Sequence, residues 1–176
     1  MGKTSIDGQA GGPKKAWQTY EEVAAYLLNQ LAGEFYLGSV IGKQSVPGIS
    51  SGTTYVIDAK GFKQDGEGFV VVECRRYTTS KLNQERVGAL AYRIWDTRAE
   101  GGIIVSPLGL QEGAKRIAQA ENIIEVSLDP ASSCESYVIA FLNKVIVGVT
   151  ETLTMTESGR VIVSDPDGTI RETSSF

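Results

Sequence analysis

Two acidic and two basic residues lie on neighbouring apolar segments, at positions where they could do chemistry together. Asp58 and Lys60 lie within the segment TYVIDAKGF, and Glu73 and Arg75 end the next apolar segment, FVVVECRRY. Paired carboxylates are the ligands that Mg²⁺ or Mn²⁺ prefers, and a cation beside them can stabilise the charge that develops when a phosphodiester is cleaved. We therefore take Asp58, Glu73, Arg75 and Lys60 as candidate catalytic residues, and the two acids as candidate metal ligands.

The two segments are expected to pair as a β-hairpin. The sequence KQDGEG between them contains D-G and E-G pairs, which favour a tight turn. Because side chains alternate along a strand, Asp58 and Lys60 share one face of the first strand, and Glu73 and Arg75 share one face of the second. Each acid is about seven residues from the turn, so both carboxylates are expected on the same face at the same height. Two facing carboxylates repel unless one is protonated or a metal bridges them.

The remaining elements follow from hydrophobic periodicity and from capping signals. A helix is expected from Thr19 to Gly33, a short strand over 35–42, a turn-rich loop over 43–52, a helix from Leu82 to about Trp95, a strand over 102–106, a helix from Ser106 to about Ala120 and a strand over 123–127. This order predicts an α/β domain whose mixed central sheet carries helices on both faces. Farther along, 137–155 and 160–164 are expected to form a β-hairpin.

Three divisions of the chain are expected: a flexible leader over 1–17, a core domain over 18–128, and a hairpin extension with a polar tail over 129–176. Cys74 alternates with the apolar positions of its strand and is expected in the core. Tyr92 and Trp95 on the following helix are also expected to be core residues rather than surfaces for stacking nucleic-acid bases.

The composition excludes several classes of protein. The chain has 176 residues and no histidine, which rules out His-based triads, HExxH zinc sites and histidine general bases. Two cysteines without metal-site spacing are typical of a reducing, cytoplasmic compartment. No apolar run reaches the ~18 residues that cross a bilayer. The net charge of −4 is uneven, because residues 60–116 carry ten Lys and Arg against seven Asp and Glu, whereas 121–176 carry three against nine.

The pattern Asp58, fourteen residues, then Glu73-Cys74-Arg75-Arg76-Tyr77 resembles the PD-(D/E)xK nuclease superfamily. More narrowly, it is similar to the Mrr-like restriction endonuclease domain, which has an aspartate on its second strand and a (D/E/Q)-C-K-R-Y-like run on its third. The elements that follow are similar as well: a helix, the strand GIIVS, a helix with the stretch EGAKRIAQA, and a closing strand. The resemblance covers roughly residues 18–128.

The resemblance implies a restriction-endonuclease-like fold, a mixed central sheet flanked by helices, to which the C-terminal β-hairpin is an extension. It implies an endonuclease of restriction or defence type that hydrolyses DNA phosphodiester bonds with Mg²⁺ or Mn²⁺. One position departs from the pattern, because Arg75 stands where the family has lysine, and arginine stays protonated and presents a planar fork. Either Lys60 supplies the ammonium, or Arg75 clamps the transition state at a reduced rate, or the site is inactive.

The resemblance also suggests accessory residues. Some relatives use an acid of the first helix beside the metal, which makes Glu22 a candidate, although its capping-box spacing from Thr19 explains it equally well. Candidate contacts to the DNA backbone are Arg76, Lys81, Gln84 and Arg86, with Arg93 farther along the same helix.

Two rival functions remain open from the sequence. One is a catalytically inactive nuclease fold that serves DNA binding or assembly, and the other is a junction-resolving nuclease. The expected partners are DNA and either a second copy of the chain or a larger restriction-type assembly. Because the segment 121–176 is acidic, its hairpin is expected to mediate dimerisation or to pack on the core rather than to read DNA.

Overall fold

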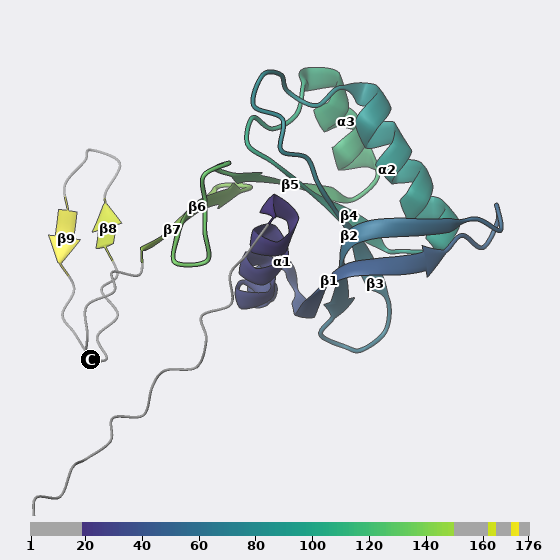
Figure 1. Cartoon of the computed structure of the whole chain (residues 1–176), viewed down its shortest axis with the longest axis horizontal. Coiled ribbons are helices and arrows are strands. Elements are labelled where there is room, and N and C mark those ends of the chain that lie inside the picture. Colours follow the sequence, from purple (N-terminus) through teal and green to yellow (C-terminus); the bar gives the residue numbers. More distant parts are fainter. Residues whose placement is uncertain (1–18, 150–161, 165–169, 173–176) are drawn as a thin grey trace, which may run out of the picture.

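The computed structural model describes residues 19–149, 162–164 and 170–172. Within these ranges the chain forms a seven-stranded sheet with helices on both faces and a separate two-stranded sheet (Figure 1). The elements in chain order are α1 (Tyr20–Gln30), η1 (Ala32–Phe35), β1 (Leu37–Pro47), β2 (Thr54–Lys63), β3 (Phe69–Cys74), α2 (Gln84–Thr97), β4 (Gly101–Ser106), α3 (Glu112–Ala120), β5 (Ile123–Leu128), β6 (Ser136–Phe141), β7 (Lys144–Val149), β8 (Ile162–Ser164) and β9 (Ile170–Glu172).

The main sheet is mixed, as predicted. Its strands lie in the order β1-β2-β3-β4-β5-β6-β7. The pairs at both ends are antiparallel, whereas β3, β4 and β5 are parallel to one another. Because parallel strands end at the same edge of a sheet, the ends of β3 and β4 at Cys74 and Ser106 lie together, and the loops that follow them lead to α2 and α3.

Two apolar cores lie on opposite faces of the sheet. On one face α1 packs Leu27 and Leu28 against Val72 and its neighbours, and on the other α2 and α3 pack against Val71 and its neighbours. The consecutive valines of β3 therefore serve both cores, which is typical of a strand covered on both sides. Cys74 is buried in the α1 core, as predicted.

Strand β1 is longer than the sequence suggested. The region 43–52 was expected to be a loop, but β1 runs to Pro47, and Gln44 pairs with Ile57 of β2. Polar residues are tolerated there because β1 is an edge strand with one exposed face, and Pro47 ends it. The turn itself is confined to the residues between β1 and β2, where Gly52 has a φ of +68°.

Helix α3 begins later than expected. Ser106–Pro107 was predicted to start it, whereas the observed helix begins at Glu112. Gly109 has a φ of +73°, a left-handed conformation that interrupts a helix. The next N–H, that of Leu110, donates to Glu125 Oε1 at 2.9 Å, which fixes this loop to β5.

The C-terminal hairpin differs from its expected form. Strands β6 and β7 pair with each other around Leu142, whose φ is +51°, and β6 pairs with β5, so that the hairpin extends the main sheet. The segment 150–161, which contains the turn expected before 160–164, lies outside the described residues, as do the predicted leader and most of the tail. Strand β8 pairs with β9. Among the described residues, no helix combines the length and the apolar character that a bilayer crossing requires.

Candidate functional site

Strands β2 and β3 bring Asp58 and Glu73 together. Ala59 is opposite Val72, so the next position outward places Asp58 level with Glu73. The backbone pairing of β2 with β3 ends at Ala59 and Val72. Beyond it, the Asp58 side chain replaces a backbone acceptor, because its Oδ2 accepts a hydrogen bond of 2.7 Å from the Cys74 N–H. The Arg75 N–H continues the pairing on the other side of β3 by donating to Val105 O of β4 at 2.8 Å. The backbone around the two acids is therefore fixed on both sides.

Arg75 folds back so that its guanidinium lies between the two acids. It donates to Glu73 Oε1 and, at 2.9 Å, to the carbonyl oxygen of Cys74. Its Nη1 lies 3.6 Å from Asp58 Oδ2. Two carboxylates and one carbonyl thus converge on a single cation. The repulsion expected between the facing acids is relieved in this structure by Arg75.

A second arginine reaches the same glutamate from helix α2. Arg93 Nη1 lies 2.9 Å from Glu73 Oε2, so that each carboxylate oxygen of Glu73 has its own guanidinium. The Glu73 side chain is only 7% exposed, and a buried charge of this kind is stable only when it is paired. Arg93 is a site residue that the motif alone does not reveal, since it is twenty residues away in the chain.

The arginines surround a small hollow beside Glu73. Its volume is about 40 Å³, and it is lined by Glu73, Arg75, Arg86, Ala89, Leu90, Arg93 and Ile104. The lining contains three arginines and one glutamate, and the Asp58 carboxylate lies 3.6 Å from Arg75, so an excess of one positive charge remains there. Arginine presents planar pairs of N–H donors that match phosphate oxygens, so this hollow is suited to an anion such as a phosphate group.

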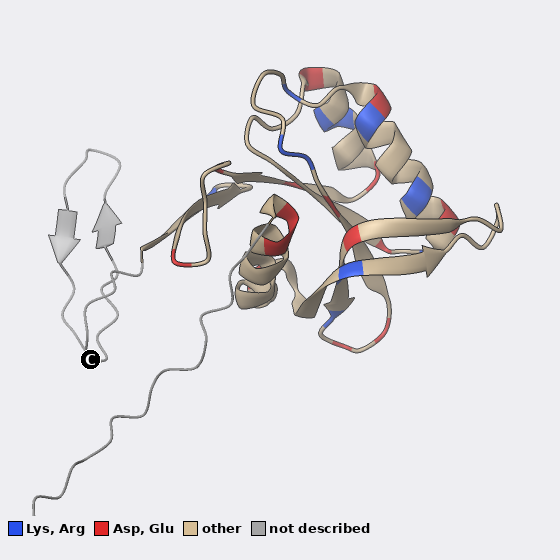
Figure 2. Cartoon of the chain, viewed as in Figure 1, with Lys and Arg blue, Asp and Glu red and all other residues tan. Residues whose placement is uncertain are grey.

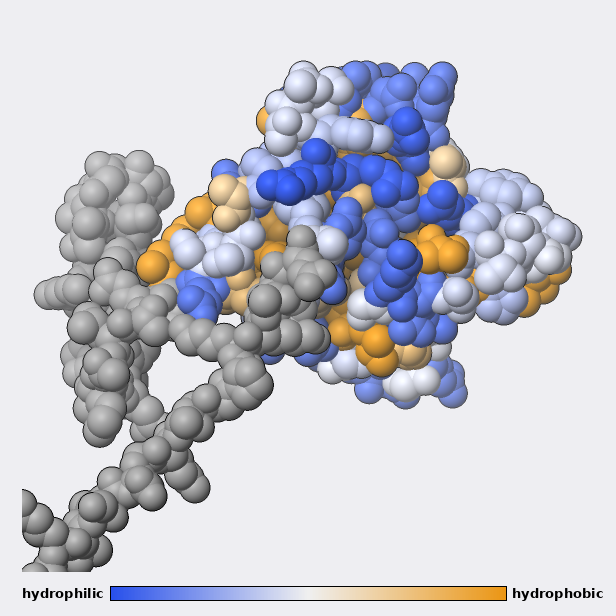
Figure 3. Space-filling view, in the orientation of Figure 1, coloured by the Kyte–Doolittle hydropathy of each residue, from blue (hydrophilic) through white to orange (hydrophobic). Residues whose placement is uncertain are grey.

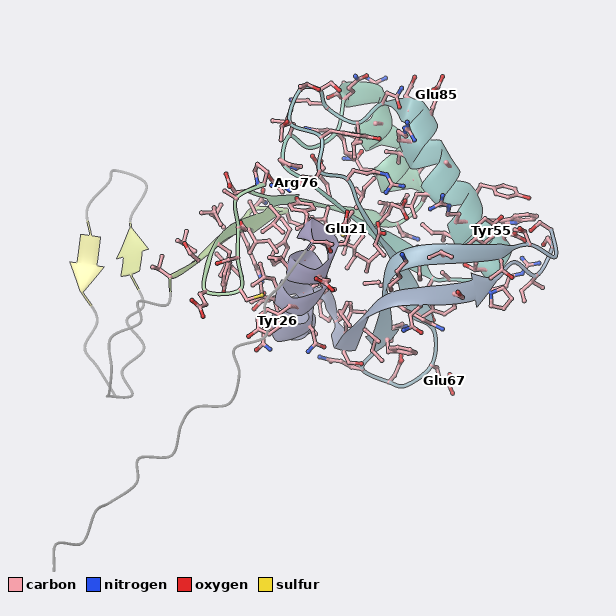
Figure 4. All side chains as sticks on the ribbon, in the orientation of Figure 1. Glu21, Tyr26, Tyr55, Glu67, Arg76 and Glu85 are labelled. Atoms are coloured by element: carbon pink, nitrogen blue, oxygen red, sulfur yellow. The ribbon has the colours of Figure 1, made fainter. Side chains whose placement is uncertain are left out.

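Of the two acids at the start of the first helix, Glu21 is half-buried and Glu22 is exposed. Glu22 forms the capping box with Thr19 that its spacing predicts. Burial raises the pKa of the Cys74 thiol, and the negative charges of Asp58 and Glu21 raise it further, which places both acids near that thiol. Figure 4 shows Glu21 at the N-terminal end of α1.

A signal for Glu21 was present in the sequence. Glu21 is three, four and seven residues before Ala24, Ala25 and Leu28, all of which are buried, so it continues the buried stripe of α1. An acid on the core-facing side of a helix is a stronger sign of a functional site than an acid at a capping position, because a carboxylate is rarely buried unless it is paired.

Lys60 points away from the acids. Its Nζ lies 4.1 Å from the centre of the Phe69 ring and 5.1 Å from that of Phe62. In the described part of the chain it forms no ion pair with Asp58 or Glu73. The cations beside the acids are therefore supplied by Arg75 and Arg93.

The candidate DNA-backbone residues line the loop after β3 and the start of α2. Lys81, Gln84 and Arg86 are exposed, and the exposed Arg76 donates to Pro130 O at 2.9 Å. Figure 2 shows Lys and Arg residues along this loop and along α2. The predicted helix-face positions are thus accessible, Arg86 also lines the arginine-lined hollow, and Figure 3 shows mostly hydrophilic residues at the surface in the region of α2.

The oxygen atoms at the site fit a divalent metal ion. Asp58 Oδ2, Glu73 Oε1 and the Cys74 carbonyl already surround one cationic group. Hard oxygen ligands of this kind suit Mg²⁺ or Mn²⁺, and Mg²⁺ commonly takes one or two carboxylates and keeps several waters. Among residues 19–149, 162–164 and 170–172, no group of three or more His, Cys, Asp or Glu side chains gathers at one point, so the backbone carbonyl is needed to complete three protein ligands.

An aspartate on the second strand and an acid–x–cation run on the third, presented by a mixed sheet with helices on both faces, define the PD-(D/E)xK class of proteins. The model of the restriction endonuclease family matches residues 15–129, which is well over half of the chain. The chain therefore belongs to the Mrr-like restriction endonuclease family.

Two solved structures are similar to this chain. One is a protein of unknown function, AF1548, with 15% identity and a TM-score of 0.49 over 58% of this chain and 55% of that chain. The other is a repair endonuclease from Pyrococcus abyssi, with 23% identity and a TM-score of 0.41 over 66% of this chain and 50% of that chain. The chain thus spans about half the length of each. No curated protein matches it.

Proposed function

We propose that this chain is a divalent-metal-dependent endonuclease that hydrolyses DNA phosphodiester bonds. The observation that carries the proposal is the convergence of Asp58, Glu73 and the Cys74 carbonyl on one cation position, next to an arginine-lined hollow. Membership of a restriction endonuclease family supports the same reaction, and restriction or defence against foreign DNA is the setting that it suggests.

Asp58, Glu73 and the Cys74 carbonyl would hold the metal. When bound, a divalent ion polarises a phosphate oxygen and lowers the pKa of a water molecule, which makes that water a better nucleophile. The hydrogen bond from the Cys74 N–H keeps the Asp58 carboxylate in place, and Arg93 holds the far oxygen of Glu73. The chain therefore presents its ligands in a fixed arrangement.

The arginines have an electrostatic role. Arg93 and Arg86 line the hollow from α2 and would bind the oxygens of the phosphate that is attacked. Arg75 would stabilise the charge that builds up on the phosphate, but it cannot accept a proton, since guanidinium remains charged in proteins. The proton of the attacking water must therefore pass to a carboxylate or to solvent.

A second candidate function rests on the same arginine. Arg75 occupies the point where the three oxygens meet, and Glu73 is satisfied by two guanidinium groups. A nuclease fold whose acids are neutralised in this way could bind DNA without cutting it. DNA binding that depends on salt, together with the absence of metal binding by calorimetry, would favour this alternative.

The test is cleavage of supercoiled plasmid by the full chain with Mg²⁺, with Mn²⁺ and with EDTA. We expect nicked and linear products only with metal, and a loss of at least about a hundredfold in rate for Asp58→Asn, since removing one electrostatic group at a reacting centre typically costs that much. Asp65→Asn is the matched control, because Asp65 is an exposed acid in the turn of the same hairpin.

Two results would overturn the proposal. One is a wild-type protein that cuts no DNA with either metal. The other is an Asp58→Asn variant that cuts as fast as Asp65→Asn, which would assign the cutting to a contaminant or to another part of the chain.

A further inference from the structure

A belt of aromatic and basic side chains runs around helix α2 away from the acids. We call Arg93, Tyr55, Tyr92, Trp95 and Arg98 the aromatic track. The Arg93 guanidinium lies 5.9 Å from the Tyr55 ring centre, the rings of Tyr92 and Trp95 are 5.6 Å apart, and Arg98 lies 5.5 Å from the Trp95 ring. The Tyr55 hydroxyl donates to Asp96 Oδ2 at 2.7 Å, and Asp96 is the residue after Trp95 on α2.

Two members of the track correct an expectation. Tyr92 and Trp95 were expected in the core, yet they are 51% and 52% exposed. Helix α2 fills its core stripe with Val87, Leu90 and Ile94, which leaves the aromatic pair on the outer side. Large aromatic rings that pack against each other at a tilt of 40° in solvent are unusual for a surface with only a structural role.

The track is continuous with the candidate active site. Arg93 belongs to both, because it contacts Glu73 Oε2 with Nη1 and lies beside Tyr55. Tyr55 is three residues before Asp58 on β2, and Figure 4 shows it where β2 approaches the end of α2. The residue before Arg93 on α2 is Tyr92, whose ring packs against that of Trp95, so the track continues from Arg93 to this pair.

A buried aspartate holds the Tyr55 end of the track. Asp96 on α2 accepts hydrogen bonds from the backbone N–H groups of Ser50 and Ser51, and from the Tyr55 hydroxyl at 2.7 Å. Ile49 also donates its N–H to Asp96 O at 2.8 Å. These bonds fix the loop between β1 and β2 and the Tyr55 ring to α2. Ligand binding would therefore require little ordering of the track.

The chemistry of the track matches unpaired bases. Bases in a duplex cover each other's faces, whereas bases in a single strand expose a face that can stack on Tyr or Trp. Arginines at both ends of the track suit the phosphates on either side of such bases. A second copy of the chain is the rival occupant, because Tyr, Trp and Arg are also enriched at protein interfaces. The contact of Arg93 with Glu73, which joins the track to the candidate active site, favours nucleic acid.

We propose that the aromatic track binds unpaired bases next to the scissile phosphodiester, so that the preferred substrate is duplex DNA that adjoins a single-stranded segment. This inference rests on the proposed nuclease function, because it places the cut at the acids and the unpaired strand on α2. The track then acts as a specificity surface and leaves the chemistry to the site around Glu73.

The test compares binding of a blunt 20-base-pair duplex with binding of the same duplex carrying a 10-nucleotide single-stranded tail, by fluorescence anisotropy in EDTA. We expect the tail to tighten binding to the full wild-type chain by about tenfold, and Trp95→Ala to remove that gain, since stacking of one base is worth roughly five- to a hundredfold in affinity. Trp95→Phe should keep most of it. Tyr36→Ala is the control, because Tyr36 is 80% exposed and lies before β1, far from α2 in the chain.

Tryptophan fluorescence gives a second measurement. The chain has two tryptophans, Trp17 and Trp95. In a Trp17→Phe background only Trp95 reports, and the tailed duplex should quench its emission more than the blunt duplex does. Circular dichroism melting confirms that each variant is folded.

The outcomes separate the two proposals. Equal binding of tailed and blunt duplex, or a Trp95→Ala variant that keeps the gain, overturns the aromatic track even if metal-dependent cleavage is found. A wild-type dimer that Trp95→Ala dissociates overturns it as well, because the surface would then be an interface between copies. The protein could also bind the tailed duplex more tightly and yet cut no DNA with any metal. This result would overturn the proposed nuclease function and support the aromatic track as a surface that stacks unpaired bases.

Discussion

Arg75 is expected to compete with the metal for the same three oxygens. Its Nη1 is 3.6 Å from Asp58 Oδ2, and both side chains are about one quarter exposed. A pair of unit charges at this distance interacts by about 4–5 kcal/mol at an effective dielectric constant of ~20, and by about 1 kcal/mol in water. A metal ion that displaces the guanidinium must offset an energy between these limits. Replacing Arg75 with neutral glutamine should therefore tighten metal binding by at least about tenfold, which corresponds to roughly 1.4 kcal/mol.

The assay is isothermal titration calorimetry of Mn²⁺ into wild type, Arg75→Gln and Arg75→Lys. We expect the dissociation constant to fall in Arg75→Gln and to lie between the other two in Arg75→Lys, whose compact ammonium does not span the three oxygens as a planar fork does. The plasmid-cutting rate should still fall in Arg75→Gln, because charge stabilisation at the phosphate is lost.

The adjacent Arg76 supplies the control for this experiment. It is exposed and donates to Pro130 O, so Arg76→Gln removes the same charge from the same strand end without freeing the acids. Its metal affinity should stay within about twofold of wild type. An Arg75→Gln variant that binds Mn²⁺ no more tightly than Arg76→Gln would refute the competition between Arg75 and the metal.

Three further predictions follow from the site and its surroundings. Arg93→Gln should lower kcat/KM for DNA about ten- to a hundredfold and reduce the slope of log affinity against log salt by about one, as measured by anisotropy, whereas the exposed Glu112→Gln should leave that slope unchanged. Glu21→Gln should weaken Mn²⁺ binding several-fold in calorimetry, whereas Glu22→Gln should leave the Mn²⁺ affinity unchanged and, by weakening the helix cap, lower the melting temperature by a few degrees. Asp96→Asn should lower the melting temperature by about 5 °C or more, and it should remove a part of the acid denaturation seen by circular dichroism.

The pH dependence of the Asp96 contribution has a definite sign. Hydrogen bonds from the Ser51 hydroxyl, then from the Tyr55 hydroxyl and the backbone of Ser51 and Ser50, lower the pKa of Asp96 from 3.8 to about 2. Because the folded-state pKa is the lower one, the stabilisation is fully present above about pH 4 and is lost as the pH falls toward 2. Wild type and Asp96→Asn should therefore differ in stability most above pH 4 and converge below pH 2. A difference that grows as the pH falls would contradict this assignment.

Each of the other two predictions has its own contrary result. Equal effects of Glu21→Gln and Glu22→Gln on metal affinity would remove Glu21 from the site. An unchanged salt slope in Arg93→Gln would mean that this arginine only neutralises Glu73 and does not contact phosphate.

The proximity of the two acids was predictable from the sequence, because it depends only on residues that are near each other in the chain. Asp58 and Glu73 lie on two strands joined by a short turn, so period-two alternation and the turn composition were enough to bring them level. The element order was likewise readable, since the buried strands and α2 have strong apolar patterns. These features depend on neighbouring residues in the chain.

The cations and the surface aromatics depended on packing that the sequence does not reveal. Arg93 reaches Glu73 only because α2 packs on the face of the sheet beside β3, and the fold-back of Arg75 is held by its hydrogen bond to the Cys74 carbonyl. Lys60 alternates with Asp58 on β2, as predicted, but its ammonium lies over the Phe69 ring, which attracts the positive charge. The prediction that Trp95 is buried was wrong. Aromatic residues are usually buried, but Val87, Leu90 and Ile94 already fill the core-facing stripe of α2.

Anomalous X-ray diffraction from a crystal of the full chain soaked in Mn²⁺ tests most directly whether Asp58, Glu73 and the Cys74 carbonyl form a divalent-metal site. We expect one strong anomalous peak bound by these three oxygens, with the Arg75 guanidinium displaced from its present position between the acids. A map with no peak at these oxygens, and with Arg75 still in contact with Glu73 at a saturating Mn²⁺ concentration, would contradict it.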